Sequence, residues 1–231
     1  ISDCAQDIKG LPIHVSIIEV MGRNAGWLAA SSALARRDKN DAPHIILFPE
    51  VPFDEEKFLN LVKEKHQKYG GVIVVASEGL KDKGGKPIVA PIFKTERATY
   101  FGDVGSYLQT LVISKLGIKA RSEKPGLLSR CSTSLTSNLD LKEARLMGKV
   151  AVDAVLKGKN GYMTGIKRIS SNPYKIKPIL IPIEEVMLKE SIFPKKYMSE
   201  DKYNVSEEFI EWLRPLVGYP REAISFVDKD K

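Results

Sequence analysis

Hydrophobic residues follow two different spacings along the first 160 residues of the chain. The run Val15–Val20 is short, β-branched and mostly apolar, and residues 72–76 read Val-Ile-Val-Val-Ala. Continuous apolar runs of this length are typical of strands buried on both faces of a parallel sheet. Between Asp54 and Tyr69, apolar residues instead recur every three or four positions, which predicts an amphipathic helix.

The two patterns alternate along the chain. They predict strands at residues 15–20, 44–48, 72–76 and 118–121, and helices at residues 26–37, 54–69, 104–117 and 140–158. Asp54 and Asp140 have the side chain of a helix N-cap, and Glu143 would complete a capping box with Asp140. Strands that alternate with helices predict an α/β fold, with a mostly parallel sheet and flanking helices.

The two ends of the chain carry weaker signals. Residues 1–10 show neither a capping residue nor a clean period, and the first residue is Ile1 rather than Met, so we expect a fragment of a longer protein. Extended runs at residues 162–169 and 179–181 flank an Asn-Pro-Tyr turn, and a short helix is expected at residues 207–213.

Composition narrows the classes of partner. The net charge of +7 favours anionic partners, although the Lys and Arg residues are scattered and equally fit an ordinary solvated surface. No apolar run approaches the roughly 18 residues of a membrane span. No helix-turn-helix, zinc or aromatic stacking motif accompanies the charge, which argues against nucleic acid. The two cysteines and three isolated histidines have no metal-ligand spacing, so we expect no zinc site and a reducing, cytoplasmic environment.

Three segments with suitable chemistry follow predicted strands, at the edge where parallel sheets bind ligands. Gly22 lets a ligand approach the backbone of Met21-Gly22-Arg23 closely. The backbone N–H groups at the start of the following helix could face a phosphate, and Arg23 could pair with its oxygens. Glu78 could accept hydrogen bonds from sugar hydroxyls. Arg121 and Arg130 could clamp a phosphate from two sides. Taken singly, the first segment fits a tight turn, Glu78 fits a cap, and the arginines fit surface charge.

Taken together, the segments resemble the phosphofructokinase family. The pattern Glu-Val-Met-Gly-Arg-x-x-Gly at residues 19–26 is similar to that family's signature. The blocks at residues 48–54 and 74–79, Arg121, and the Gly-x-x-x-Arg pattern at residues 126–130 follow in the family's order and spacing, from about residue 13 to residue 175.

This resemblance implies roles for individual residues. Arg23 would help to neutralise the transferring phosphoryl group. Glu78 would bind sugar hydroxyls, and Arg121 would reach into the site of a neighbouring subunit, so a homodimer or homotetramer with shared sites is expected. The contacts to fructose 6-phosphate would come from Met21, Gly22, Arg23, Glu78, Arg121, Leu127, Leu128 and Arg130, and from His14, which stands where the family often has Arg.

The resemblance also has gaps. Family members carry a glycine-rich donor region and a Thr-x-Asp-x-Asp block with the aspartate base upstream of Met-Gly-Arg, and residues 1–16 match neither. We therefore expect the C-terminal part of a phosphofructokinase-like fold, lacking its N-terminal half. Ser129 replaces the usual Gln, and magnesium, which the resemblance implies, would find its ligands outside this chain.

The expected organisation has three parts: a fructose 6-phosphate-binding domain at residues 1–130, a segment returning to the donor-binding domain at 131–175, and a C-terminal extension at 176–231. The apolar stripe of the helix at 140–157 would pack against the missing half. Residues 21–29 and 167–174 look most like the diphosphate-dependent members, with ATP as the alternative donor. A non-catalytic sugar-phosphate-binding module is the other alternative.

Overall fold

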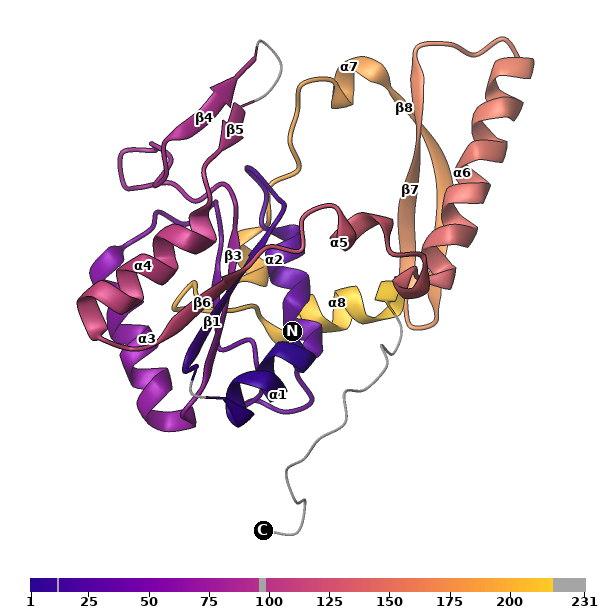
Figure 1. The fold of residues 1–231 in the computed structure, drawn as a ribbon. Helices are drawn as coiled ribbons and strands as arrows, with labels where there is room; N and C mark the ends of the chain where they lie inside the picture. Colours follow the sequence, from indigo (N-terminus) through magenta and orange to yellow (C-terminus); the bar gives the residue numbers. More distant parts are fainter. Residues whose placement is uncertain (12, 96–98, 218–231) are drawn as a thin grey trace. The chain divides into compact units, whose positions relative to one another are not determined.

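The computed structural model describes residues 1–11, 13–95 and 99–217, with the backbone alone at 99–101. The described chain divides into two compact units (Figure 1). Unit 1 consists of residues 1–130 and 192–210, and unit 2 consists of residues 131–191 and 211–217. Each unit is described by itself.

Unit 1 is built on a four-stranded parallel sheet with the strand order β2-β3-β1-β6. The strands are β1 (Val15–Val20), β2 (Ile45–Leu47), β3 (Val72–Ser77) and β6 (Ala120–Glu123). Val15 lies opposite Val72 on one side and Ala120 on the other, so the strands start in near register. All carboxyl ends therefore point to one edge of the sheet, and the predicted α/β class is confirmed.

Helices cover both faces of this sheet (Figure 1). One face packs against α3 (Glu55–Tyr69) and α4 (Val104–Leu116), and the other against α1 (Ser2–Gly10) and α2 (Trp27–Ser31). The predicted cap of α3 is confirmed, because the Asp54 side chain accepts a hydrogen bond of 3.1 Å from the Lys57 N–H. Gly70, with a φ of 72°, ends the helix.

Two helices differ from the sequence prediction. Helix α1 was not expected, and its only buried residue is Ile8, so it leaves almost no periodic signal. The helix expected at 26–37 ends at Ser31 and continues as a 3-10 turn, η1 (Ser32–Ala35). The hydroxyls of Ser31 and Ser32 donate back to the carbonyls of Leu28 and Ala29, a local bond that competes with regular helix.

Residues 192–210 complete unit 1. Phe193 and Phe209 are fully buried, and both rings contact Trp27. The Ile46 N–H of the edge strand β2 donates to the Tyr203 carbonyl at 2.8 Å, so this segment covers the outer side of the sheet. It includes η3 (Lys195–Tyr197) and leads into α8 (Glu207–Val217).

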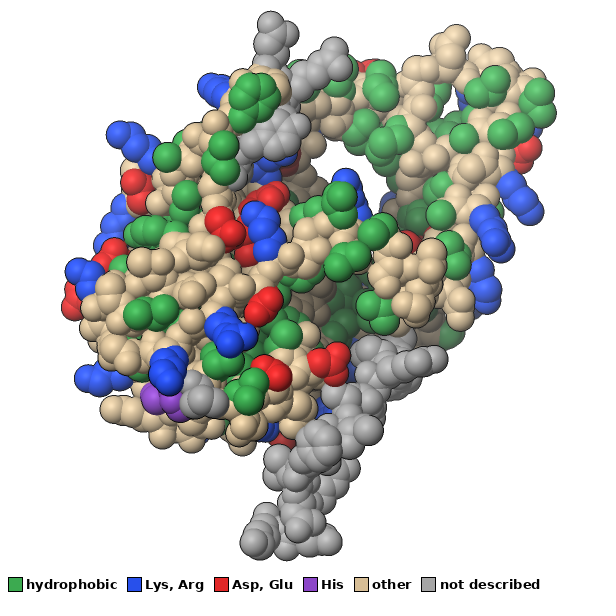
Figure 2. Space-filling model, viewed as in Figure 1, with side chains coloured by type: hydrophobic (Ala, Val, Ile, Leu, Met, Phe, Trp, Pro, Cys, Tyr) green, Lys and Arg blue, Asp and Glu red, His purple; other side chains and the backbone are tan. Residues whose placement is uncertain are grey.

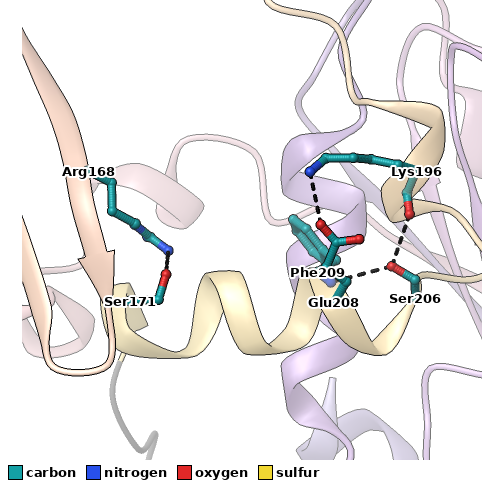
Figure 3. A network of polar contacts seen from close by, with 6 residues as sticks. All are labelled: Arg168, Ser171, Lys196, Ser206, Glu208 and Phe209. Carbon is teal, nitrogen blue, oxygen red and sulfur yellow. Dashed lines mark hydrogen bonds and ion pairs between the residues drawn. The ribbon is translucent and has the colours of Figure 1, made fainter.

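The first turn of α8 is fastened to this same segment (Figure 3). The Lys196 ammonium lies 2.9 Å from Oε1 of Glu208. The Ser206 hydroxyl donates to the Lys196 carbonyl and accepts from the Phe209 N–H. Unit 1 also contains an antiparallel pair of strands, β4 (Pro91–Lys94) and β5 (Thr99–Phe101).

Unit 2 packs α6 (Asn138–Leu156) against a hairpin of β7 (Tyr162–Ser171) and β8 (Tyr174–Pro182). Smaller elements are η2 (Thr133–Leu135) and α7 (Ile183–Val186), and α5 (Leu128–Cys131) crosses the boundary between the units. Arg168 of β7 donates to Ser171 (Figure 3). Its guanidinium also lies over the rings of Tyr174 and Trp212.

The capping box predicted for α6 is wrong. Ser137, not Asp140, is the N-cap, and its hydroxyl accepts from the Asp140 N–H. Glu143 does not reach back to the cap, because Tyr174 of β8 donates to its Oε1 at 2.7 Å. Burial and this hydrogen bond raise the pKa of Tyr174 to about 12.

Unit 2 leaves much apolar surface exposed (Figure 2). No residue of α6 is buried in the described chain. Of the predicted stripe, Met147 and Ala151 are half-buried beside the hairpin, while Leu141, Ala144 and Val155 are exposed. The last turn of α6 adds Leu156, which is 80% exposed.

Candidate functional site

The carboxyl ends of β1 and β3 form the centre of the candidate site. Val20 lies opposite Ser77, and its carbonyl accepts a hydrogen bond of 3.0 Å from the Glu78 N–H. The Ser77 hydroxyl donates to the Gly22 carbonyl at 2.8 Å. The structure thus brings the 21–23 loop and Glu78 together, because their strands are neighbours in the sheet.

Close backbone packing fixes the shape of this loop. Gly22 has a φ of 133°, and a Cβ there would lie 2.6 Å from the Ala25 carbonyl oxygen. Gly79 lies directly against the Arg23 backbone, where a Cβ would be 2.9 Å from its Cα. Both positions therefore require glycine. Within this loop the Arg23 side chain is exposed and Met21 is half-buried.

The start of α2 is held by Glu50, a residue that the sequence analysis did not single out. Its Oε1 accepts from the Gly26 N–H at 2.9 Å and from the Phe193 N–H at 2.6 Å. The Ala25 N–H donates to the Gly22 carbonyl at 3.0 Å. Both of these N–H groups therefore have partners inside the chain, and the expectation that the start of the helix faces a phosphate stays a prediction.

The segment after β6 lies at the same edge, on the other side of β1. Residues 125–130 form tight turns, with the Leu128 N–H bonded to the Pro125 carbonyl and the Arg130 N–H to the Leu127 carbonyl. Leu127 and Leu128 are 62% and 71% exposed, and Arg130 is also exposed. These three predicted residues are thus available to a ligand.

His14 and Arg121 lie at the opposite edge of the sheet. His14 precedes β1, and Arg121 of β6 is paired with Ser16. Met21 is five residue steps along the chain from Ser16, which is roughly 16 Å at the usual rise per residue of a strand. Within one chain these two residues are not brought together with the 21–23 loop.

Glu19 is a further residue that the sequence analysis left without a role. It is a carboxylate in a buried strand, only 1% exposed, and burial raises its pKa. Its partners are the Lys124 ammonium and the Gly105 N–H. The signal was present in the sequence, because a charge inside an apolar strand needs a partner.

In residues 1–11, 13–95 and 99–217, no three His, Cys, Asp or Glu side chains are grouped so that they could hold a metal ion. Over the same ranges, no helix combines the length and hydrophobicity needed to cross a membrane.

Comparison with known proteins decides the family. A family model described as Phosphofructokinase matches residues 1–155. This chain belongs to the phosphofructokinase family. The predicted resemblance is confirmed, and the fold described above is that of a phosphofructokinase chain.

Individual relatives agree with this assignment. The chain is 37% identical over 205 residues to a pyrophosphate–fructose 6-phosphate 1-phosphotransferase of Xanthomonas campestris, a match that covers 88% of the chain and 49% of that protein. It is 34% identical over 218 residues to a Halomonas elongata protein of the same name, with 94% and 51% covered.

A solved structure shows the same relationship. The crystal structure of a pyrophosphate-dependent phosphofructokinase from Marinobacter aquaeolei superposes with a TM-score of 0.81 at 31% identity, covering 98% of this chain and 54% of that one. The phosphofructokinase chain thus spans about half the length of the curated relatives it matches. The roles of individual site residues and the three expected domain boundaries stay predictions.

Proposed function

We propose that this chain supplies the acceptor side of a diphosphate-dependent 6-phosphofructokinase, which transfers a phosphoryl group to the 1-hydroxyl of fructose 6-phosphate. The observation that carries the proposal is the junction of the 21–23 loop with Glu78 at the carboxyl edge of the sheet. The relatives named for this reaction and donor match nearly the whole chain.

Each residue has a task that follows from its chemistry. Arg130 and Arg23 are exposed cations suited to phosphate oxygens, and a guanidinium binds them with two parallel hydrogen bonds. Glu78 is half-buried, and its carboxylate accepts from sugar hydroxyls. Met21 and the exposed leucines 127 and 128 provide apolar contact to the sugar. Arg23 also neutralises charge on the phosphoryl group in transit.

The proton acceptor and the donor phosphates lie outside this set of residues. Phosphoryl transfer needs a base for the attacking hydroxyl and a cation on the donor phosphates. We assign magnesium to the donor, with ligands outside this chain, because the described residues offer no group that fits a metal ion.

We also propose that the enzyme is an oligomer with shared sites. Arg121 and His14 lie at the amino edge, out of reach of their own 21–23 loop, which supports a homodimer or homotetramer in which they serve a neighbour's site.

Residues 1–130 would be the sugar-phosphate domain, 131–175 the return to the donor domain, and 176–231 a C-terminal extension, of which 218–231 lie outside the described residues. The two free cysteines, Cys4 and Cys131, support a cytoplasmic location.

A donor assay of the full-length gene product tests the function. With fructose 6-phosphate and magnesium, we expect turnover with diphosphate to exceed turnover with ATP. Preference for ATP overturns the donor, and turnover with neither overturns the activity.

The isolated 231-residue chain provides a second test. It should bind fructose 6-phosphate in calorimetry yet show no turnover with diphosphate or ATP, because it lacks the base. Turnover by the purified chain, after contamination is excluded, would place the base among these residues. The exposed apolar surface of α6 should also make the isolated chain self-associate, which sedimentation measures.

A further inference from the structure

An ion pair between a buried carboxylate and a partly exposed lysine lies next to the candidate site. Glu19 belongs to β1, and Lys124 is the first residue after β6. The Lys124 ammonium pairs with Oε1 of Glu19, whose other oxygen accepts from the Gly105 N–H at 2.8 Å. One carboxylate therefore joins the end of β1, the start of α4 and the segment after β6.

The surroundings of this carboxylate leave little free space. A Cβ at Gly105 would lie 3.4 Å from the Cβ of Glu19 and would overlap the Ser122 hydroxyl of β6. Asp103, the N-cap of α4, accepts from the Ser106 N–H at 2.8 Å. The first turn of α4 is thus packed on β1 and β6, so the carboxylate is held on a rigid support.

Lys124 is the more exposed member of the pair. Its side chain is 44% exposed, compared with 1% for Glu19. Burial works against the charged ammonium, but the ion pair with Glu19 and the nearby Asp103 and Glu78 outweigh it and raise the pKa of Lys124. Lys124 therefore stays charged and balances a carboxylate that would otherwise be buried without a counter-charge.

The turn that follows depends on this anchor. The N–H groups of Leu128, Ser129 and Arg130 donate to carbonyls of residues 125–127, inside the same turn. Leu127, Leu128 and Arg130, which are the predicted ligand contacts, are all exposed. Lys124 thus ties this turn to the strand that carries the 21–23 loop.

We propose that Glu19 and Lys124 act together as positioning residues, which hold the 124–130 turn against the end of β1 and so set the affinity for the phosphate of the acceptor. The identity of that acceptor rests on the proposed function. The positioning itself rests on the contacts described above.

The kinetic test uses the full-length gene product. Lys124→Met should raise the KM for fructose 6-phosphate about tenfold, the lower end of what loss of a charge-assisted contact costs, and leave the KM for diphosphate unchanged. Lys124→Arg keeps the charge and should restore most of the affinity. The matched control is Lys83→Met, which removes an exposed ion pair with Asp54 and should change neither KM.

The double variant Glu19→Gln with Lys124→Met separates positioning from stability. Removing both charges should recover part of the Tm lost in Lys124→Met, because no buried carboxylate is left unpaired. The KM for fructose 6-phosphate should stay raised, because the turn is still untied. Recovery of the KM together with the Tm would show a purely structural role and overturn the proposal.

Amide hydrogen exchange makes the inference independent of the substrate. In Lys124→Met, residues 124–130 should exchange faster than in the wild type, while α3 should be unchanged. Unchanged exchange in the turn overturns the positioning role. A wild-type protein that does not use fructose 6-phosphate overturns the proposed function instead, and the exchange result still stands.

Discussion

Gly79→Ala is the sharpest test of how the site is assembled. The new methyl group would overlap the Arg23 carbonyl oxygen and lie 2.9 Å from the Arg23 Cα. The φ of Gly79 is outside the left-handed region, so alanine meets a steric obstacle without a backbone penalty. The effect of the variant therefore measures the contact between the end of β3 and the 21–23 loop.

The size of the effect follows from this overlap. Non-bonded carbon and oxygen atoms keep a separation of about 3.5 Å, while the new Cβ would lie 1.4 Å from the Arg23 carbonyl oxygen, so the loop must move by roughly 2 Å. Overpacking of this kind costs about 1–3 kcal/mol of stability. A displacement of about 1 Å at a reacting group can reduce the rate about 100-fold. We expect kcat/KM for fructose 6-phosphate to fall by about that factor.

The assay combines thermal unfolding with steady-state kinetics of the full-length gene product. Gly10→Ala is the matched control, because a Cβ there meets nothing within 4 Å. If Gly79→Ala melts like the control and retains kcat/KM within about twofold, the described packing of the loop is wrong.

Three further predictions address other parts of the chain. Arg130→Ala should raise the KM for fructose 6-phosphate about ten- to hundredfold, since a charge-assisted phosphate contact is lost, and an unchanged KM refutes the assignment. Arg121→Ala and Glu78→Gln, each inactive alone, should regain activity as mixed oligomers, because some hybrid sites are intact; confirmed mixing without activity argues against shared sites. Burial lowers the pKa of His44 from 6.5 to about 4, so the neutral ring, whose Nδ1 accepts from the Ile73 N–H, contributes stability above pH 6.5 that is lost as the pH falls toward 4. In His44→Asn, the denaturation midpoint should depend less on pH between 6.5 and 4 than in the wild type. A midpoint that depends on pH as strongly as that of the wild type contradicts the assignment.

Local signals in the sequence were sufficient for most of unit 1. The runs at Val15–Val20 and 72–76 predicted strands because a strand buried on both faces has few polar residues. Asp54 predicted the start of α3 because its carboxylate has one obvious local partner, the N–H of Lys57. Ile8 alone gives α1 no periodicity, so that helix could not be found from its own residues.

At the candidate site, local sequence signals predict some residues but not their long-range partners. Gly22, Arg23 and Glu78 could be predicted because each follows a strand, and the carboxyl ends of parallel strands share one edge. The partners of Glu19 and Glu50 lie 105 and 143 residues further along the chain, at Lys124 and Phe193. Such pairs depend on the arrangement of strands and returning segments, which hydrophobic spacing alone does not specify.

The return of residues 192–210 to the first sheet has a consequence for synthesis on the ribosome. The N–H of Ile46 at the edge of β2 bonds to Tyr203, and the Trp27 ring packs against Phe193, Tyr197 and Phe209. A nascent chain therefore carries an open sheet edge and an empty aromatic pocket for more than 140 residues of translation. Open edges pair with other chains, so the interval before residues 192–210 are synthesised is when this part of the chain is most exposed to aggregation.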